Sequence, residues 1–343
     1  MVAEHEKWTA WLNTLPLDPR VTFCHLWLKS EGTGFSFTGE VDSRQTLSLV
    51  AQLFSRDFPQ ANARVSWNVS LLPPQNRGDV LFAMVRVPVC DMRQDPRFRS
   101  ERTNQLLFGE WVRLLRVDKN PYLLVQSEKT RYIGYVHRST LDFCSEKQKQ
   151  QMNQLPLFHV CSRFAFLESG GANQEDLGWC PMGADFPVDI VPDKGKCRVV
   201  LPSQSFWVNK DEVQEKRAFD RGMLRAQFHA YVRNFLRVPY LWGGNSLFGT
   251  DCSGFAGRMY DFFGRTIPRD ADMQQAACEA VPFEKLQPGD LVFFPGHVGV
   301  YVADGWIVHA NVTLGGVTWS QIQNPQTGYD QKLREDMTGC GRF

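Results

Sequence analysis

The sequence lacks the features that indicate a membrane-spanning or metal-binding protein. No apolar run approaches the roughly 20 residues that a helix needs to cross a bilayer. The nine cysteines are odd in number and include no Cys-x-x-Cys pair, so neither a zinc site nor a disulfide framework is indicated. We therefore expect most of the cysteines to be buried free thiols in a reducing compartment.

The sequence also has no excess of charge of either sign. It contains 38 Lys and Arg against 37 Asp and Glu, for a formal net charge of +1. Nothing in this balance favours binding to nucleic acid or to an anionic membrane. With 343 residues, 43% of them hydrophobic and 22% charged, the chain has the composition of a globular protein of two to four domains.

A secretory signal peptide is not apparent either. The first residues, MVAEHEKWTAWLNTL, show no basic segment followed by an apolar core and a small-residue cleavage site. This favours a cytoplasmic location. The alternative is a secreted or periplasmic protein whose chain has been trimmed.

The first segment, 1–80, reads as a small α/β unit. Helices are predicted around Glu4–Leu15 and Asp42–Phe54, and strands around Val21–Leu28 and Arg64–Leu72. No recognisable chemistry lies in this unit, and we interpret it as structural.

The middle of the chain changes to short strands broken by polar turns, which is typical of small barrels. We expect one barrel at 81–143 and a second at 155–210. The charged, Gln-rich stretch Cys144–Gln154 lies between them and is interpreted as a linker.

The last segment, 218–343, has a mixed pattern. Apolar residues at helical spacing predict a helix over Phe219–Phe235, and a second helix is expected over Cys252–Phe263, closed by Gly264. Three antiparallel strands are then predicted, over Leu291–Phe294, Val298–Val302 and Trp306–Asn311.

Cys252 is the first candidate for chemistry. It follows a glycine-rich loop and precedes an apolar-periodic helix. A thiol at a helix N-terminus is close to the positive end of the helix dipole, which favours the reactive thiolate, and its backbone N–H can contribute to an oxyanion hole. On this local pattern alone, a buried structural cysteine is an equal alternative.

Two histidines on neighbouring strands favour the catalytic interpretation. If Ala303–Gly305 forms a three-residue loop, His297 lies opposite Asn311, and His309 is diagonally adjacent on the same face. A two-residue loop would put the two histidines on opposed faces. With Cys252, the histidines would form a nucleophile, a base and a residue that orients the base, a set suited to acyl transfer.

These residues resemble the NlpC family of cell-wall cysteine peptidases. The resemblance covers roughly 220–320, and its motifs are Tyr240-Leu-Trp-Gly-Gly, Asp251-Cys252-Ser253-Gly254, Pro268-Arg269-Asp270, Leu286-Gln-Pro-Gly-Asp-Leu-Val-Phe-Phe294, the His297 strand and His309-Ala310. It implies a papain-like domain with Cys252, His297 and His309 as the triad and Tyr240 supporting the oxyanion site.

The barrel segments resemble the bacterial SH3-like domains that precede such a peptidase, on Val87–Arg93 and Leu106–Glu110. The expected fold class is thus α+β: a small α/β unit, two SH3-like barrels and a C-terminal NlpC-type domain. Family members of this layout are typically endopeptidases that cut between D-Glu and meso-diaminopimelate or L-Lys in peptidoglycan stem peptides. Several accept only peptides with a free N-terminal L-Ala, which suits a role in cell-wall recycling.

The resemblance also implies where the substrate binds. Asp251 and Ser253 would hold the free amino end, Arg269 and Asp270 would line the cleft, and Glu101 would supply a second carboxylate. Trp242 is the remaining residue that we assign to substrate binding. Two alternatives stay open: Glu101 is a solvated loop charge, and Arg269 and Asp270 only pair with each other.

The resemblance implies no metal and no organic cofactor. The expected partners are stem peptides, with no nucleic acid and no membrane span, and the oligomeric state is not indicated. Two other functions remain: an amidase or acyltransferase acting on another substrate, and a cell-wall binding module with a silent catalytic domain.

Overall fold

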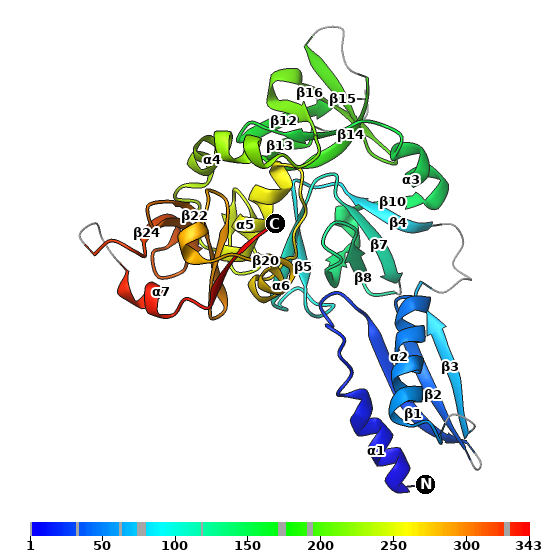
Figure 1. Ribbon diagram of the computed structural model, residues 1–343. Helices are drawn as coiled ribbons and strands as arrows, with labels where there is room; N and C mark the ends of the chain where they lie inside the picture. Colours follow the sequence, from blue (N-terminus) through cyan, green and yellow to red (C-terminus); the bar gives the residue numbers. More distant parts are fainter. Residues whose placement is uncertain are drawn as a thin grey trace.

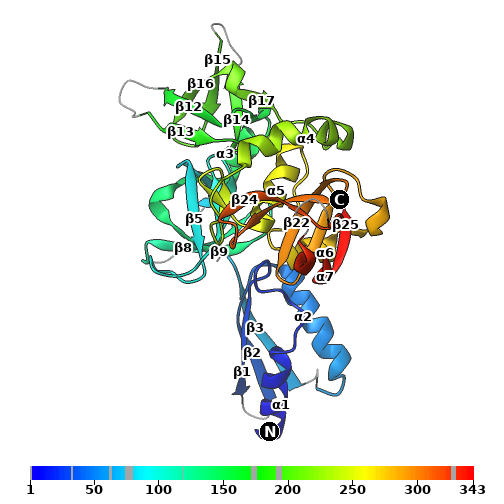
Figure 2. The ribbon, with the colours of Figure 1, turned by 90° about the vertical axis from the view of Figure 1, so that its left-hand side faces the viewer.

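The computed structural model describes residues 2–31, 34–61, 64–73, 80–117, 119–170, 176–190, 195–325 and 330–343. Four units follow one another along the chain, each built around a β-sheet (Figure 1). Figures 1 and 2 show the N-terminal unit projecting from one end of the molecule, with the first barrel next to the C-terminal unit. None of the described helices is both long and apolar enough to span a membrane.

The N-terminal unit is a three-stranded sheet with two helices on one face. Its elements are α1 (Val2–Leu12), β1 (Cys24–Glu31), β2 (Gly34–Val41), α2 (Arg44–Asp57) and β3 (Val65–Leu71). Strand β1 is antiparallel to β2, and β2 is parallel to β3. Ser43 accepts a hydrogen bond from the Thr46 N–H and so caps α2. Aromatic rings fill the core, where Trp8 contacts both Phe35 and Phe54.

The first barrel is a seven-stranded sheet in the order β10-β4-β7-β8-β9-β5-β6. Its strands are β4 (Val80–Val85), β5 (Val89–Arg93), β6 (Arg102–Leu107), β7 (Trp111–Arg116), β8 (Tyr122–Ser127), β9 (Ile133–His137) and β10 (Leu141–Ser145), with a 3₁₀ turn at Arg138–Thr140. Alternating apolar side chains from these strands form a closed core.

The segment Cys144–Gln154, which we interpreted as a linker, connects the two barrels but has regular structure of its own. Cys144 belongs to β10, and helix α3 (Glu146–Met152) follows it directly. Ser145 and Gln148 form a capping box, in which each side chain satisfies the other residue's backbone N–H. The Lys149 ammonium lies 4.2 Å from the centre of the Phe82 ring, so the helix is fixed against the first barrel.

The second barrel has strand order β13-β12-β16-β15-β14-β11-β17. Its strands are β11 (Leu157–Val160), β12 (Phe164–Ser169), β13 (Gly178–Pro181), β14 (Asp185–Ile190), β15 (Lys196–Val200), β16 (Ser205–Asn209) and β17 (Val213–Glu215), with a 3₁₀ turn at Lys210–Glu212. Strand β17 pairs with β11, so this sheet extends past residue 210, where we expected it to end.

The C-terminal unit packs two helices on a six-stranded antiparallel sheet of order β20-β25-β21-β22-β23-β24. Its elements are α4 (Arg221–Phe235), β18 (Asn245–Ser246), β19 (Gly249–Thr250), α5 (Cys252–Phe262), α6 (Ala271–Ala277), β20 (Glu279–Ala280), a 3₁₀ turn (Phe283–Lys285), β21 (Leu291–Phe294), β22 (His297–Ala303), β23 (Trp306–Asn311), β24 (Gly316–Gln321), α7 (Gln331–Glu335) and β25 (Gly339–Arg342). Phe255 and Met259 of α5 share a buried core with Val298 and Val308 of the sheet. This packing sets the start of α5 beside the histidine strands.

A buried group of charges lies where the two barrels meet α5, and we call it the junction cluster. Lys129 Nζ lies 2.7 Å from both Asp185 and Asp261, Lys216 Nζ lies 2.5 Å from Asp185 and 2.8 Å from Asp261, and Arg258 lies 2.6 Å from Glu110. Three cations therefore face three carboxylates contributed by three units. The cluster fixes both barrels to the helix that carries Cys252, because leaving any of these charges unpaired is costly.

Candidate active site

Asp251 and Cys252 form the junction between the glycine-rich loop and α5. Asp251 is the N-cap residue, and its Oδ1 accepts the Gly254 N–H at 2.7 Å while its Oδ2 accepts the Gly243 N–H at 3.0 Å. Cys252 is the first helical residue and is 6% exposed. A Cβ on Gly254 would collide with the Gly244 carbonyl, so the loop and helix can approach this closely only with glycine.

The Cys252 thiol is buried next to the Asp251 carboxylate. Burial and the Asp251 carboxylate raise its pKa to about 11, although the N–H groups of Val298 and Ser253 act in the opposite direction. Burial lowers the pKa of His297 to about 4. Burial thus favours the neutral forms of both side chains in the free site, whereas the Ser253 N–H at the start of α5 favours the thiolate, as expected for a thiol at a helix N-terminus.

The two histidines lie together, although the loop between their strands is not the one we predicted. Val300 pairs with Val308, but Ala303 pairs with Trp306, so only two residues form the turn. Asp304 and Gly305 both have positive φ, at 50° and 77°, as a type I′ turn requires. A β-bulge between Tyr301 and Ala303 takes up the extra residue and restores the register that a three-residue loop would give.

As a result, His297 Nε2 lies 2.7 Å from His309 Nδ1. His309 is fully buried, and its Nε2 lies 3.0 Å from Ser320 Oγ on β24. For His297 Nδ1 to accept the thiol proton, its Nε2–H must donate to His309 Nδ1. His309 then donates its Nε2–H to Ser320 Oγ, so the three side chains fix one another's protons.

Ser320 was missed by the sequence analysis, although the pattern contained a signal. Ser320 pairs with Ile307 and is thus two positions from Thr318, the partner of His309. This is the same diagonal, same-face relation that we used to associate His309 with His297.

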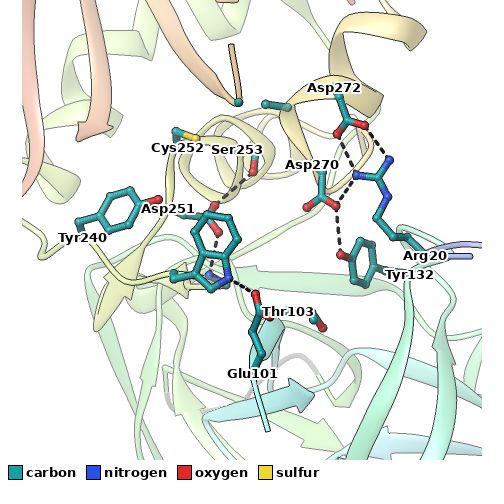
Figure 3. A pocket seen from close by; sticks show the side chains of 14 residues that line it. Arg20, Glu101, Thr103, Tyr132, Tyr240, Asp251, Cys252, Ser253, Asp270 and Asp272 are labelled. Atoms are coloured by element: carbon teal, nitrogen blue, oxygen red, sulfur yellow. Dashed lines mark hydrogen bonds and ion pairs between the residues drawn. The ribbon is translucent and has the colours of Figure 1, made fainter. Parts of the chain in front are cut away.

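Tyr240 lines the same cavity as Cys252. Burial, together with the nearby Cys252 and Asp251, raises the pKa of its phenol to about 12, so the hydroxyl remains a hydrogen-bond donor. Figure 3 shows this hydroxyl directed toward the start of α5.

The cavity beside Cys252 has a volume of about 300 Å³ and receives side chains from three units. The N-terminal unit contributes Arg20, the first barrel contributes Glu101, Thr103 and Tyr132, and the C-terminal unit contributes Tyr240, Trp242, Asp251, Cys252, Ser253, Asp270 and Asp272 (Figure 3). Four carboxylates and a single guanidinium are thus among these residues. Such a lining favours a cationic group of the ligand.

Glu101 and Trp242 meet at this cavity from different units. The Trp242 Nε1–H donates to the Glu101 carboxylate at 2.6 Å, and the Trp242 side chain is otherwise exposed. Gly243, with a positive φ of 69°, allows the loop to pass directly over the Arg102 carbonyl of the barrel. Glu101 is an exposed loop residue, as in the alternative of a solvated loop charge, and it also lines the cavity and accepts this hydrogen bond.

Arg269 does not line the cavity as we expected. It is 3% exposed, and its Nη1 and Nη2 donate to the two oxygens of Asp251 at 3.0 and 2.7 Å. Its Nη1 also donates to Ser253 Oγ at 2.9 Å, whereas Asp270 is 3.9 Å away. Arg269 thus acts from behind, by holding Asp251 and Ser253, and the alternative that it only pairs with Asp270 is also wrong.

Asp270 lines the cavity, as expected, and has two partners that the sequence analysis missed. Its Oδ2 accepts hydrogen bonds from the Tyr132 hydroxyl at 3.0 Å and from Arg20 at 2.9 Å. Tyr132 lies in the first barrel and Arg20 in the N-terminal unit, so no local pattern connected either one with Asp270. Among the described residues, no three or more His, Cys, Asp or Glu side chains are grouped to hold a metal ion.

Comparison with known proteins identifies two parts of the chain. Residues 237–334 match the NlpC/P60 family, and residues 92–141 match the bacterial dipeptidyl-peptidase Sh3 domain. Dipeptidyl-peptidase 6 of Lysinibacillus sphaericus is 24% identical over 76% of this chain and 98% of its own length. The γ-D-glutamyl-L-lysine dipeptidyl-peptidase of Bacillus subtilis is 40% identical, over 29% of this chain and 36% of its own.

A related dipeptidyl-peptidase of Bacillus cereus, also named for γ-D-glutamyl-L-lysine, is 45% identical over 33% of this chain, and the match spans only 37% of that relative. The crystal structure of an NlpC/P60 family protein from Bacillus cereus superposes with a TM-score of 0.66 at 23% identity, over 76% of this chain and 99% of that one. The matches confirm the α+β fold class, with the NlpC/P60 domain C-terminal to an SH3-like domain.

Proposed function

We propose, from the NlpC/P60 peptidase domain that residues 237–334 form, that this protein cleaves peptidoglycan stem peptides between D-Glu and the following L-diamino acid. The diamino acid is meso-diaminopimelate or L-Lys, and fragments with a free N-terminal L-Ala are preferred. One observation supports this most directly: the cavity beside Cys252 is small, and four of the side chains that line it are carboxylates against a single guanidinium. At about 300 Å³ it has the volume of a small-molecule site, which suits a released peptide better than cross-linked wall.

The proposed chemistry uses Cys252 as the nucleophile and His297 as the base. His297 Nδ1 takes the thiol proton as the sulfur attacks the γ-glutamyl carbonyl. The Cys252 backbone N–H and the Tyr240 hydroxyl donate to the oxyanion that forms. The intermediate collapses to a thioester, and His297 gives its proton to the departing amine. Water, deprotonated by His297, then attacks the thioester, and the released thiolate takes the proton back.

The pair His309 and Ser320 maintains His297 in the form that this sequence of steps needs. When His297 becomes an imidazolium, its Nε2–H still donates a hydrogen bond to His309 Nδ1. Ser320 keeps the proton of His309 on Nε2, away from His297. The third position of the triad thus orients the base without carrying a charge.

A free substrate amine has a second effect in this proposal. The Asp251 carboxylate is one of the two causes that raise the pKa of the Cys252 thiol. An ammonium bound next to Asp251 would offset that negative charge and would ease the loss of the thiol proton. Binding of the correct N-terminus and activation of the nucleophile would then be coupled through a single side chain.

Mass-spectrometric product analysis tests the proposal. The substrates are L-Ala-γ-D-Glu-meso-diaminopimelate, its L-Lys analogue and the N-acetylated form of each, with Cys252→Ala as the control. Release of the diamino acid only from the free-amine peptides, and only by the wild-type protein, is the expected result. Cleavage of the acetylated peptides as well would remove the preference for a free amine. No cleavage would refute the peptidase proposal and would leave an amidase, an acyltransferase or a binding module.

The proposed role is turnover of released wall fragments inside the cell rather than lysis of intact wall. The narrow cavity, with the wall of the first barrel on one side, supports this role because a glycan strand attached to L-Ala would meet Glu101 and Tyr132. Purified protein should therefore leave intact sacculi undegraded while it hydrolyses the free peptides, and rapid clearing of sacculi would contradict this role.

A further inference from the structure

The N-terminal unit reaches the cavity through one side chain. Arg20 lies in the connection between α1 and β1, outside both segments that match known families, and it is among the residues that line the cavity next to Cys252 (Figure 3). The sequence analysis treated the whole of 1–80 as structural. This contact gives the unit a part in the site.

The position of Arg20 is fixed by the first barrel. Its carbonyl accepts the Ile133 N–H at 2.7 Å, and the carbonyl of the next residue, Val21, accepts the Gln126 side-chain amide at 2.9 Å. The backbone N–H of Arg20 donates to the Asp18 carboxylate at 2.9 Å. The backbone is therefore held on both sides of the guanidinium.

The hydrogen bonds of Arg20 show what it can and cannot bind. Its Nε and Nη2 donate to Asp18 at 3.0 and 2.7 Å, and its Nη1 and Nη2 donate to the two oxygens of Asp272 at 2.9 and 2.7 Å. Its Nη1 also donates to Asp270 at 2.9 Å. A guanidinium has five N–H donors, and these contacts use all of them. No donor remains for a carboxylate of a substrate.

We propose that Arg20 is a positioning residue that acts through Asp270, and that the N-terminal unit thereby sets the preference of the cavity for a ligand with a free ammonium group. This inference rests on the proposed function. Both Tyr132 and Arg20 donate to Oδ2 of Asp270, which turns Oδ1 away from them. Arg269 Nη1 lies 3.9 Å from that Oδ1, an ion-pair contact that is too long for a hydrogen bond, so Oδ1 can still accept from an ammonium in the cavity that Asp270 lines.

Arg20 is one of the groups that favour the charged form of Asp270. Burial raises the pKa of Asp270, and Arg269, Tyr132 and Arg20 counteract this rise. Asp272 and Asp18, which hold the far side of the Arg20 guanidinium, are the other charged groups of this contact. Without Arg20, Asp272 would also lose its cation, and both changes favour the protonated form of Asp270. A neutral Asp270 would bind an ammonium only weakly.

The test compares Arg20→Met and Arg20→Lys with the wild-type protein on the free-amine and N-acetylated tripeptides. We expect Arg20→Met to raise KM for the free-amine peptide about tenfold or more with little change in kcat, which is the loss of one charge-assisted contact. The acid limb of the kcat/KM profile should move to higher pH, because the pKa of Asp270 rises. Arg20→Lys should recover only part of the loss, since an ammonium cannot reproduce the forked contact.

Controls separate this role from a purely structural one. Arg64→Met removes the ion pair with Glu4 within the same unit and should change neither KM nor the pH profile. If Arg20→Met does not fold, Arg20→Gln, which keeps hydrogen-bond donors but removes the charge, should change KM and the pH profile in the same direction. An unchanged KM and pH profile in Arg20→Met, or a fall in kcat with KM unchanged, would overturn the inference.

Calorimetric binding of L-Ala-γ-D-Glu to Cys252→Ala, with and without Arg20→Met, tests the inference apart from catalysis. Binding that weakens about tenfold in the double variant supports it even if the wild-type protein proves inactive on the tripeptide, a result that would refute only the proposed function. Equal binding to the two variants, or binding to neither, would overturn it.

Discussion

The charge pair Asp251–Arg269 should control the reactivity of Cys252, and its two halves should act in opposite directions. Asp251 is the second cause, after burial, of the raised pKa of the thiol, and Arg269 lowers that pKa. Asp251→Asn removes the negative charge and leaves Arg269 unopposed, so the pKa of Cys252 should fall from about 11. Arg269→Gln leaves Asp251 unopposed, so the pKa should rise.

The size of the effect follows from Coulomb's law. A unit charge about 5–8 Å away, at an effective dielectric constant of about 20, contributes roughly 2–3 kcal/mol, or roughly 1.5–2.5 pKa units. At pH 8 the thiolate fraction rises about tenfold for each pKa unit by which the thiol pKa falls. A thiolate of lower pKa is a weaker nucleophile, however, and a Brønsted coefficient of about 0.4–0.5 cancels roughly half of this gain on a logarithmic scale. Alkylation of Cys252 in Asp251→Asn should therefore be roughly tenfold faster than in the wild-type protein.

The assay is iodoacetamide alkylation followed by peptide mass spectrometry, because eight other free thiols must be distinguished from Cys252. Either substitution leaves a buried charge without its partner and destabilises the protein, so thermal melting must show that both variants are folded at the assay temperature. Asparagine also caps a helix, which preserves the start of α5 in Asp251→Asn. Loosening of the fold would accelerate alkylation in both variants, and rates that change in the same direction, or not at all, would refute the reasoning.

Three further predictions concern other contacts of the site. Ser320→Ala should lower kcat about tenfold and leave KM unchanged, because His309 loses the partner that fixes its Nε2 proton. Steady-state kinetics on the free-amine tripeptide would show this, and an unchanged kcat would count against a role of Ser320 in orienting His309. Lys129→Met leaves the carboxylates of the junction cluster with one cation fewer. Urea denaturation should therefore give a free energy of unfolding about 3–5 kcal/mol lower than for the wild-type protein. A loss below about 1 kcal/mol would mean that water solvates the cluster. Glu101→Gln should raise KM for the free-amine peptide, and an unchanged KM would show that Glu101 only holds Trp242.

The histidine hairpin shows how far the sequence determines a site. Alternation along Val298–Val302 and Trp306–Asn311 correctly predicted two paired strands, and the requirement that His309 reach His297 selected the correct register. The turn itself was not predictable in this way, because a two-residue loop with a bulge and a three-residue loop without one give the same register. A Gly after an Asp was the available signal for the shorter turn.

Contacts between units escaped the sequence analysis for a different reason. Arg20 and Asp270 are 250 residues apart, and neither lies in a pattern that refers to the other. Arg269 illustrates the same limit. The motif Pro268-Arg269-Asp270 predicted that this residue lies near the cleft, but not whether its side chain faces the cavity or lies behind Asp251. Local periodicity reports which face of an element is buried, and it carries no information about which distant side chain meets that face.

The ammonium end of the proposed ligand would be bound by carboxylates that are held in position by residues of different units. Asp251 is held by Arg269 from within the C-terminal unit, Asp270 by Arg20 and Tyr132 from the other two units, and Glu101 belongs to the first barrel. Asp270 and Glu101 thus keep their places in the cavity only while the other units are docked. Because the barrels are fixed to α5 by buried ion pairs, undocking would at once expose the junction cluster and dismantle the amine site. Specificity and assembly are therefore coupled in this fold. A variant that loosens a barrel should lose selectivity for the free amine before it loses Cys252 reactivity, since the groups that shift the pKa of the thiol all belong to the C-terminal unit.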